Sequence, residues 1–401
     1  MNEQRRAFQF ALIVTLVLRC ITSLVLAVAS EVSPIDTCLY KACDPHVFEK
    51  LNETWSGNHF LAPWYRWDTV HYLDLANPDY QNLGYEGSIW PPLYPWLIRL
   101  FSVILPDMLS ALLISTLSCL LLFYLLYREV DTYWGEKAAK KTVILLAVFP
   151  TGFFLMAGYT EALFIALSLG VFSQIRAHRW WTAGLFGVLA VLTRHQGIFL
   201  CLPIAIQGYV FIRTNLQADH EKLTVKSFLA TKKWVPVMGA ILMIAAGLSI
   251  NYCYVHFVIG APWPWQTYTT YWGRQLSFPG MGLFNMMRLL ITNSAQPIYV
   301  NMYLDAILFV IFSVSLITTR KQLPAEMFIF GAVVLLFHVS YVSGINLTMD
   351  AVSRYLLAVF PCFISLSLLL KSKISYLFCA GLSMAIQIIL LYFFYLWMWV
   401  A

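Results

Sequence analysis

The stretch FQFALIVTLVLRCITSLVLAVAS, residues 8–30, decides the fold class of this chain. It is apolar apart from Arg19, Gln9 and a few small polar side chains, and it is long enough to cross the ~30 Å apolar core of a bilayer as one helix. Comparable runs recur at 108–127, 141–157, 160–177, 181–193, 197–212, 234–258, 297–318, 325–342, 355–370 and 374–400. The sequence therefore predicts an all-α polytopic membrane protein with about eleven transmembrane helices.

The composition supports this interpretation. Hydrophobic residues make up 60% of the chain and charged residues 11%, whereas charged residues make up about a quarter of a typical soluble domain. This excludes an ordinary soluble domain. Continuous apolar runs without period-two alternation also exclude a transmembrane β-barrel. We expect residues 1–401 to form one membrane domain.

The net charge of +6 indicates the orientation of the chain and not a nucleic-acid partner. Lysine and arginine gather in alternate loops, namely 5–6, 128–141, 176–179, 213–233, 320–321 and 371–373. By the positive-inside rule these loops, and with them the N-terminus, are expected on the cytoplasmic side. The other loops, which are poorer in these residues, are then extracytoplasmic.

The first extracytoplasmic loop, residues 31–107, is the longest region without a spanning run. It contains WYRWDTVHYL, residues 64–73, which places Asp68 and His71 among aromatic rings. Tryptophan and tyrosine favour the membrane–water boundary, so we expect short interfacial helices in this loop. On a helix, Asp68 and His71 are three residues apart and share a face.

A few charged side chains lie at the predicted extracytoplasmic ends of the other spans. They are Glu161 in AGYTEALF, Arg194 with His195 in TRHQG, and Arg354 in VSRYLLAVFP. Charges at membrane depth are costly and are functional candidates by default. Two of them have a structural alternative, because Arg354 also suits a helix end that reaches for lipid headgroups and Glu161 suits a helix N-terminus.

The region 181–212 around TRHQG is too short for two full crossings. A broken helix or a re-entrant hairpin, whose polar middle lines a cavity, satisfies its backbone groups.

Four segments, in this order, resemble the PIG-V-like family of mannosyltransferases: RWDTVHYL, IWPPLYP, FPTGFFLMAGYTEALF and LTRHQG. Eukaryotic members of this family, relatives of glycosylphosphatidylinositol mannosyltransferase II, add the second mannose to the anchor precursor. Gln196 departs from the asparagine that the family has in the last segment. YWGRQL and SRYLLAVFP resemble prokaryotic members, so a prokaryotic plasma membrane is expected rather than the endoplasmic reticulum.

The resemblance implies a GT-C-type bundle and transfer of mannose, with inversion, from a polyprenyl-phosphate donor to an acceptor hydroxyl. The acceptor is a glycolipid or another glycan at the extracytoplasmic face. Asp68 takes the catalytic position and His71 accompanies it, and a carboxylate is suited to remove the hydroxyl proton as a general base. The expected donor-phosphate ligands are guanidinium groups, which bind phosphate through paired hydrogen bonds, namely Arg354, Arg194 and Arg274.

The remaining candidates are expected to contact the sugar or the acceptor: Trp67, Tyr159, Glu161, His195 and Trp90. The tryptophans suit an interfacial belt equally well. No Asp-x-Asp pair occurs in the first extracytoplasmic loop, so we expect no metal and no cofactor beyond the lipid-phosphate sugar. A secondary transporter and a non-catalytic protein that binds lipid-linked sugars are the alternatives, although no inverted repeat is visible.

Overall fold

The computed structural model describes residues 3–34, 58–77, 89–218, 224–292, 299–344, 348–349 and 351–400, and the statements below concern these residues. Most of them form helices. The longest helices are α1 (Glu3–Val32), α5 (Asp107–Ala147), α10 (Trp234–Cys253), α13 (Tyr299–Thr319) and α17 (Lys373–Tyr395). Shorter ones are α6 (Glu161–Arg176), α7 (Trp180–Val191), α8 (Cys201–Ala218), α12 (Met281–Thr292), α14 (Ala325–Ser340) and α16 (Phe360–Leu369).

The described residues contain six helices that are long and apolar enough to cross a membrane. A seventh span results if the bent pair Val352–Ala358 and Phe360–Leu369 is one crossing, and α7, α12 and α14 are shorter apolar helices. The all-α, polytopic fold class is therefore confirmed. The expected number of eleven transmembrane helices stays a prediction.

The expected boundary between the runs 108–127 and 141–157 is present, but the second run ends earlier than expected. The element labelled α5 consists of two helices that meet at Gly135, which has φ 80° and ψ 170° and lies between the two runs. Glycine adopts this backbone conformation without strain. The second part ends at Ala147 and not at residue 157, because Pro150 has no N–H and disfavours helical geometry in the residue before it.

The extracytoplasmic loop expected at 259–296 also differs, because it contains regular structure. It forms α11 (Pro264–Thr270), strand β1 (Gln275–Leu276) and α12. The strand pairs antiparallel with β2 (Tyr341–Val342). Asn285 and Arg288 interrupt the apolar pattern of α12, and this conceals the helix in the sequence.

The break expected at TRHQG is present. Helix α7 ends at Val191, Arg194 is extended at φ −152° and ψ 136°, and a 3-10 helix covers His195–Leu200 before α8 begins. A Cβ atom on Gly197 would lie 2.6 Å from the backbone nitrogen of Val191, so only glycine allows this close approach. The break is a consequence of this packing.

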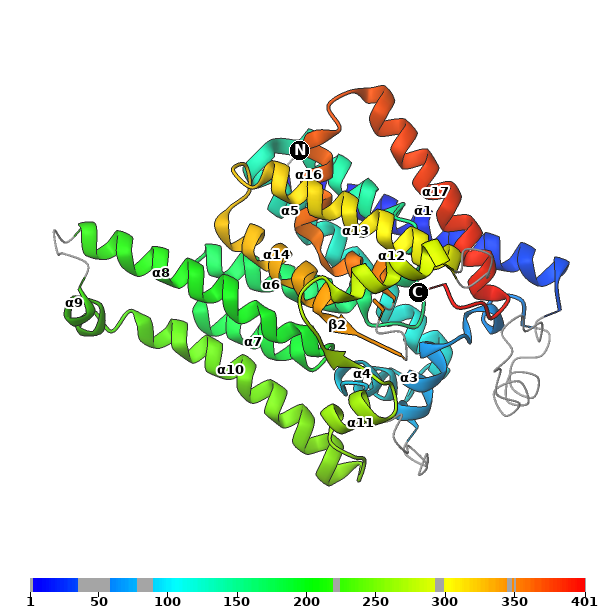
Figure 1. The fold of residues 1–401 in the computed structure, drawn as a ribbon, viewed down its shortest axis with the longest axis horizontal. Coiled ribbons are helices and arrows are strands. Elements are labelled where there is room, and N and C mark those ends of the chain that lie inside the picture. Colours follow the sequence, from blue (N-terminus) through cyan, green and yellow to red (C-terminus); the bar gives the residue numbers. More distant parts are fainter. Residues whose placement is uncertain are drawn as a thin grey trace.

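Figure 1 shows how these elements are arranged: α8 and α10 extend to one side of the molecule, and α1 and α17 lie at the other. The described part of residues 31–107, the expected first extracytoplasmic loop, forms a 3-10 turn (Ala62–Trp64), α3 (Asp68–Ala76) and α4 (Leu93–Phe101). These short helices gather near α11 and β2 (Figure 1). Residues 35–57 and 78–88 of this loop lie outside the described residues, and its interfacial position stays a prediction.

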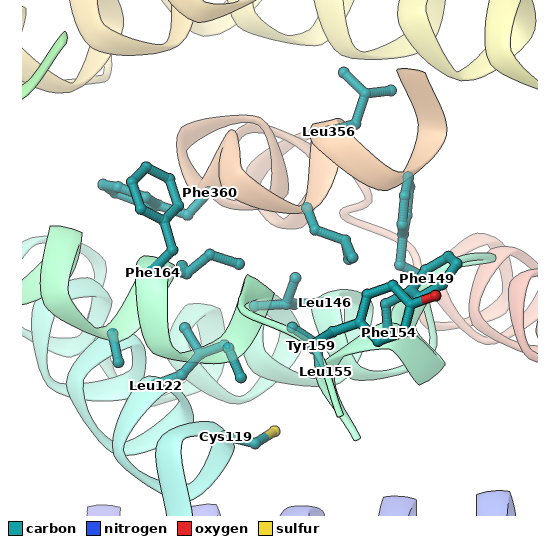
Figure 2. Packing of buried hydrophobic residues seen from close by; sticks show 14 of the residues in the cluster. Cys119, Leu122, Leu146, Phe149, Phe154, Leu155, Tyr159, Phe164, Leu356 and Phe360 are labelled. Carbon is teal, nitrogen blue, oxygen red and sulfur yellow. The ribbon is translucent and has the colours of Figure 1, made fainter. Parts of the chain in front are cut away.

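An aromatic core joins α5 and α6 to α15 (Val352–Tyr355) and α16. Figure 2 shows Phe149, Phe154 and Tyr159 close together, with Phe164 facing Phe360. Ring centroids of Phe153 and Phe154 lie 4.3 Å apart. The guanidinium of Arg354 lies 5.1 Å from the Phe154 ring, so this aromatic core packs against the charged residues described below.

Candidate active site

Asp68 is the first residue of α3 and is 7% exposed. The residue before it, Trp67, has φ 50°, which is unfavourable for a residue with a side chain. The Asp68 backbone N–H donates to the Tyr159 hydroxyl at 3.2 Å. Gly158 lets the two segments meet, because a Cβ atom there would lie 2.8 Å from Cγ2 of Thr69. The surrounding structure thus holds Asp68 in place.

Four of the candidate residues form one buried charge network. Arg354 donates through Nη2 to Oδ2 of Asp68 and through Nε to Oε1 of Glu161, the latter at 2.5 Å. Arg194 donates to the same Glu161 oxygen at 2.5 Å and to Oγ1 of Thr160 at 3.2 Å. Two carboxylates and two guanidinium groups balance in formal charge, as buried ions require.

Arg354 is itself fixed by a residue that the sequence patterns did not single out. Asp305 of α13 is 6% exposed and accepts the backbone N–H groups of Val352 at 3.2 Å and Ser353 at 2.8 Å. The Thr151 hydroxyl donates to the Ser353 carbonyl at 2.8 Å. An acid within the apolar run 297–318 was the available signal for Asp305, because such a charge is costly at membrane depth.

A cavity of about 400 Å³ opens beside this network. This volume is within the range of small-molecule sites. Asp68 is the carboxylate among its lining residues, and Arg194, Arg274 and Arg354 are the cations. Aromatic side chains make up much of the remaining wall: Tyr72, Trp90, Phe199, Tyr252, Trp265, Tyr268, Trp272, Phe337, Tyr341, Tyr355 and Trp399. The cavity therefore suits an anionic ligand with apolar or ring-shaped parts.

Two other candidates, Trp90 and His195, also line the cavity. His195 contacts the hydroxyl of Tyr268 at 3.2 Å and the side-chain amide of Asn251 at 2.7 Å. The Tyr355 ring lies 5.2 Å from the Arg194 guanidinium. Tyr268 and Tyr355 were not identified from the sequence, because isolated tyrosines near apolar runs have no distinguishing spacing.

The other candidates are near the cavity without being part of its wall. His71 stacks on Trp90 with ring centroids 5.3 Å apart. Glu161 lies behind Arg354 and Arg194. Tyr159 lies against Arg354, with 4.6 Å between the guanidinium and the ring.

Tyr72, on the same helix as Asp68, lines the cavity and is hydrogen-bonded to Thr160 at 3.2 Å. Burial, with a contribution from the Asp68 carboxylate, raises the pKa of the Tyr72 phenol. The phenol therefore stays protonated and serves as a hydrogen-bonding group. Within the described residues, no group of three or more His, Cys, Asp or Glu side chains is placed to hold a metal ion. The expectation of a metal-free site stays a prediction.

Comparison with known proteins decides the family. The model of the family described as Mannosyltransferase (PIG-V) matches residues 6–272. The chain belongs to the PIG-V family. The resemblance carried by the four sequence segments is thus confirmed.

Two PIG-V relatives illustrate the extent of the match. GPI mannosyltransferase 2 of Schizosaccharomyces pombe is 32% identical over 161 residues, which are 38% of this chain and 34% of that protein. GPI alpha-1,6-mannosyltransferase 2 of Mus musculus is 26% identical over 213 residues, 49% of this chain and 41% of that protein. The matches thus span less than half the length of these relatives. Both organisms are eukaryotes, so the prokaryotic origin stays a prediction.

Solved structures show only distant likeness to this PIG-V protein. ArnT from Cupriavidus metallidurans in the apo state gives a TM-score of 0.44 at 13% identity, over 78% of this chain and 56% of that one. The Archaeoglobus fulgidus oligosaccharyltransferase gives 0.40 at 12% identity, over 94% and 52%.

The residues that match the PIG-V family model include only part of the candidate site. Asp68, Glu161 and Arg194 lie within residues 6–272, whereas Arg274 and Arg354 lie beyond them. The family match therefore covers both acids of the network and one of its two arginines.

Proposed function

We propose that this PIG-V family member is a membrane glycosyltransferase that moves mannose from a polyprenyl-phosphate donor to an acceptor hydroxyl. The observation that carries the proposal is the position of Asp68, a carboxylate that faces a cavity whose cations are Arg194, Arg274 and Arg354. Such a cavity offers a base for the acceptor and fixed positive charge for a leaving phosphate.

The proposed step is a single displacement. The acceptor oxygen attacks the anomeric carbon of the sugar while its proton passes to the Asp68 carboxylate. The bond from the anomeric carbon to the phosphate oxygen breaks, and its electron pair leaves with the lipid phosphate. One new glycosidic bond replaces the bond to phosphate, with inversion, and no covalent enzyme intermediate is required, by analogy with inverting glycosidases.

Arg354 is central to this step because it touches Asp68 and lines the same cavity. A guanidinium in this position stabilises the charge that develops on the phosphate. Arg194 and Arg274 add two further charges to the cavity wall. The formal charge of the lining residues is thus positive, which favours a phosphate ligand.

The choice of mannose and of a glycolipid or other glycan acceptor follows from the family and from the names of its relatives. The polyprenyl-phosphate donor follows from the resemblance seen in the sequence. The proposed orientation places the N-terminus in the cytoplasm and the reaction at the extracytoplasmic face, as the distribution of positive charge indicates.

A secondary transporter is the alternative, and the depth of the charged residues in the bilayer distinguishes the two functions. Asp68 begins α3, Glu161 begins α6, and Arg194 lies in the break after α7. The charges thus gather where helices begin or end. A transporter site is expected at the middle of the membrane, between repeats.

Reconstitution tests the proposal directly. Purified protein in vesicles receives polyprenyl-phosphate mannose and a lipid extract, and the products are analysed by mass spectrometry. Wild-type protein is expected to form a mannosylated lipid. Asp68→Asn is expected to lower the rate by a factor of about 10²–10⁴, because the general base is lost.

The matched control is Asp74→Asn, which changes another aspartate of the same helix α3. It is expected to retain transfer. A wild-type protein without product, or an Asp68→Asn protein with wild-type turnover, contradicts the proposal.

A further inference from the structure

The segment that follows α17, residues 396–400, returns to the cavity. The chain reverses at Trp397, which has φ 57°. The N–H groups of Trp397 and Met398 donate back to carbonyls of α17, at 3.2 Å to Phe394 and at 3.0 Å to Phe393. Trp399 then lines the cavity together with Asp68 and Arg354. This segment lies outside the matched residues 6–272.

Arg66 connects this segment to the loop that presents Asp68. Its side chain is fully buried, and Nε donates to the Tyr395 carbonyl at 2.9 Å. Nη1 donates to carbonyls of its own loop, at 3.1 Å to Ala62 and at 3.0 Å to Tyr65. The guanidinium also lies 4.9 Å from the Trp397 ring. A buried cation with this set of acceptors fixes the two segments relative to one another.

Three tryptophan rings complete the connection. Trp67 packs on Trp397 with centroids 5.6 Å apart and on Trp399 at 5.2 Å, edge-on at 82°. Trp67 and Trp397 both have positive φ, an unfavourable conformation that persists only when surrounding contacts determine it. Asp68 follows Trp67 directly, so these contacts also set the direction of its carboxylate.

The backbone of Trp399 is held independently. The side-chain amide of Asn301, on α13, donates to its carbonyl. Trp399, Asp68 and Arg354 also border a second, narrow crevice beside Tyr159. The Trp399 side chain is thus a partly exposed ring on a fixed backbone, next to the proposed base.

We propose that residues 396–400 are part of the active site, in which Trp399 packs against the sugar of the donor while Arg66 positions Asp68 through Trp67 and Trp397. This inference rests on the proposed function and names two residues that the family motif and the charge network leave unexplained. Trp399 is assigned a contact with substrate. Arg66 is a positioning residue, because it reaches the reacting atoms only through its neighbours.

The test measures transfer kinetics of reconstituted full-length variants. Trp399→Ala is expected to lower kcat/KM on the order of tenfold, and Trp399→Phe to retain most of it, since a ring remains. The control is Trp181→Ala, which changes a tryptophan of α7 that is 57% exposed and does not line the cavity. It is expected to leave both constants unchanged.

Arg66→Lys keeps the charge but loses the forked hydrogen bonds. It is expected to lower kcat on the order of tenfold at unchanged KM for the donor, because Asp68 is misplaced while the binding groups stay. In combination with Asp68→Glu the two losses are expected to be less than additive, as for residues that act on the same step. A purely structural role would instead lower the amount of folded protein and leave kcat per folded molecule unchanged.

Each outcome decides the inference. Wild-type kcat/KM in Trp399→Ala overturns the substrate contact, and wild-type kcat in Arg66→Lys overturns the positioning role. If Arg66→Lys does not insert, Trp397→Phe takes its place with the same expected loss of kcat. Failure of the proposed function is distinguishable, because wild-type protein then transfers no sugar, and that result overturns this inference as well.

Discussion

The part of the chain that matches the PIG-V family, residues 6–272, and the part that follows it contribute different halves of one site. The first part supplies Asp68 and Glu161, the acids of the network. The second supplies Arg354, which binds both of them, and Trp399, which forms a wall of the cavity. The matched residues 6–272 therefore contain Asp68, the proposed base, but not Arg354, which pairs with it.

The strongest test of this division is removal of Arg354. Arg354→Gln leaves Asp68 and Glu161 without their shared partner, and loss of one partner of a buried ion pair lowers the free energy of unfolding by about 3–5 kcal/mol. Transfer activity is expected to be lost as well. Thermal unfolding in detergent and the transfer assay measure the two effects.

Two further variants sharpen this prediction. Adding Asp68→Asn to Arg354→Gln is expected to restore part of the lost stability, because Asp68 has lost its partner whereas Glu161 keeps Arg194. Glu136→Gln breaks two exposed pairs, with Arg6 at 3.5 Å and with Lys140 at 2.6 Å, and is expected to leave the unfolding temperature nearly unchanged. An Arg354→Gln protein as stable as wild type would contradict the central role of the network.

Substitution of Asp305 is also expected to lower stability and activity, but by less than substitution of Arg354. Asp305→Ala removes the acceptor of two buried N–H groups, at Val352 and Ser353, and is expected to lower the free energy of unfolding by about 1–3 kcal/mol. The rate of transfer should fall too, because the turn that carries Arg354 loosens. Asp305→Asn keeps one acceptor oxygen and is expected to lie between Asp305→Ala and wild type in both measurements. Equal unfolding temperatures for all three proteins would show that Asp305 does not fix Arg354.

Substitution of Arg274 is expected to cause the smallest change in stability and a selective loss of affinity for the lipid-phosphate donor. Arg274→Gln removes one cation from the cavity wall and should raise KM for the lipid-phosphate donor about tenfold, the loss of roughly one charge-assisted hydrogen bond. The unfolding temperature should not change. Arg288→Gln on α12, which removes an exposed charge, serves as the control. Unchanged donor KM in Arg274→Gln would exclude Arg274 from phosphate binding.

The sequence predicted the fold class and the family more accurately than the boundaries of the helices. Long apolar runs are visible without any structure, and the all-α polytopic fold and the PIG-V family are both confirmed. The boundaries are less accurate: the second helix of α5 ends at Ala147 and not at residue 157, and α12 lies in an expected loop. Hydropathy reports how apolar a run is, but not where a glycine or a proline changes the direction of the backbone.

The sequence by itself determined that this chain is a multi-pass membrane protein and that it belongs to the PIG-V family. It also identified a few charged residues near helix ends as candidate site residues. These properties depend on composition and on short motifs. Only the tertiary structure showed that Asp68, Glu161, Arg194 and Arg354 form one network, that His71 packs on Trp90, and that Asp305, Arg66 and Trp399 support or border the site. The reason is distance along the chain: a buried charge finds its partner through packing between segments hundreds of residues apart, and no local pattern encodes that pairing.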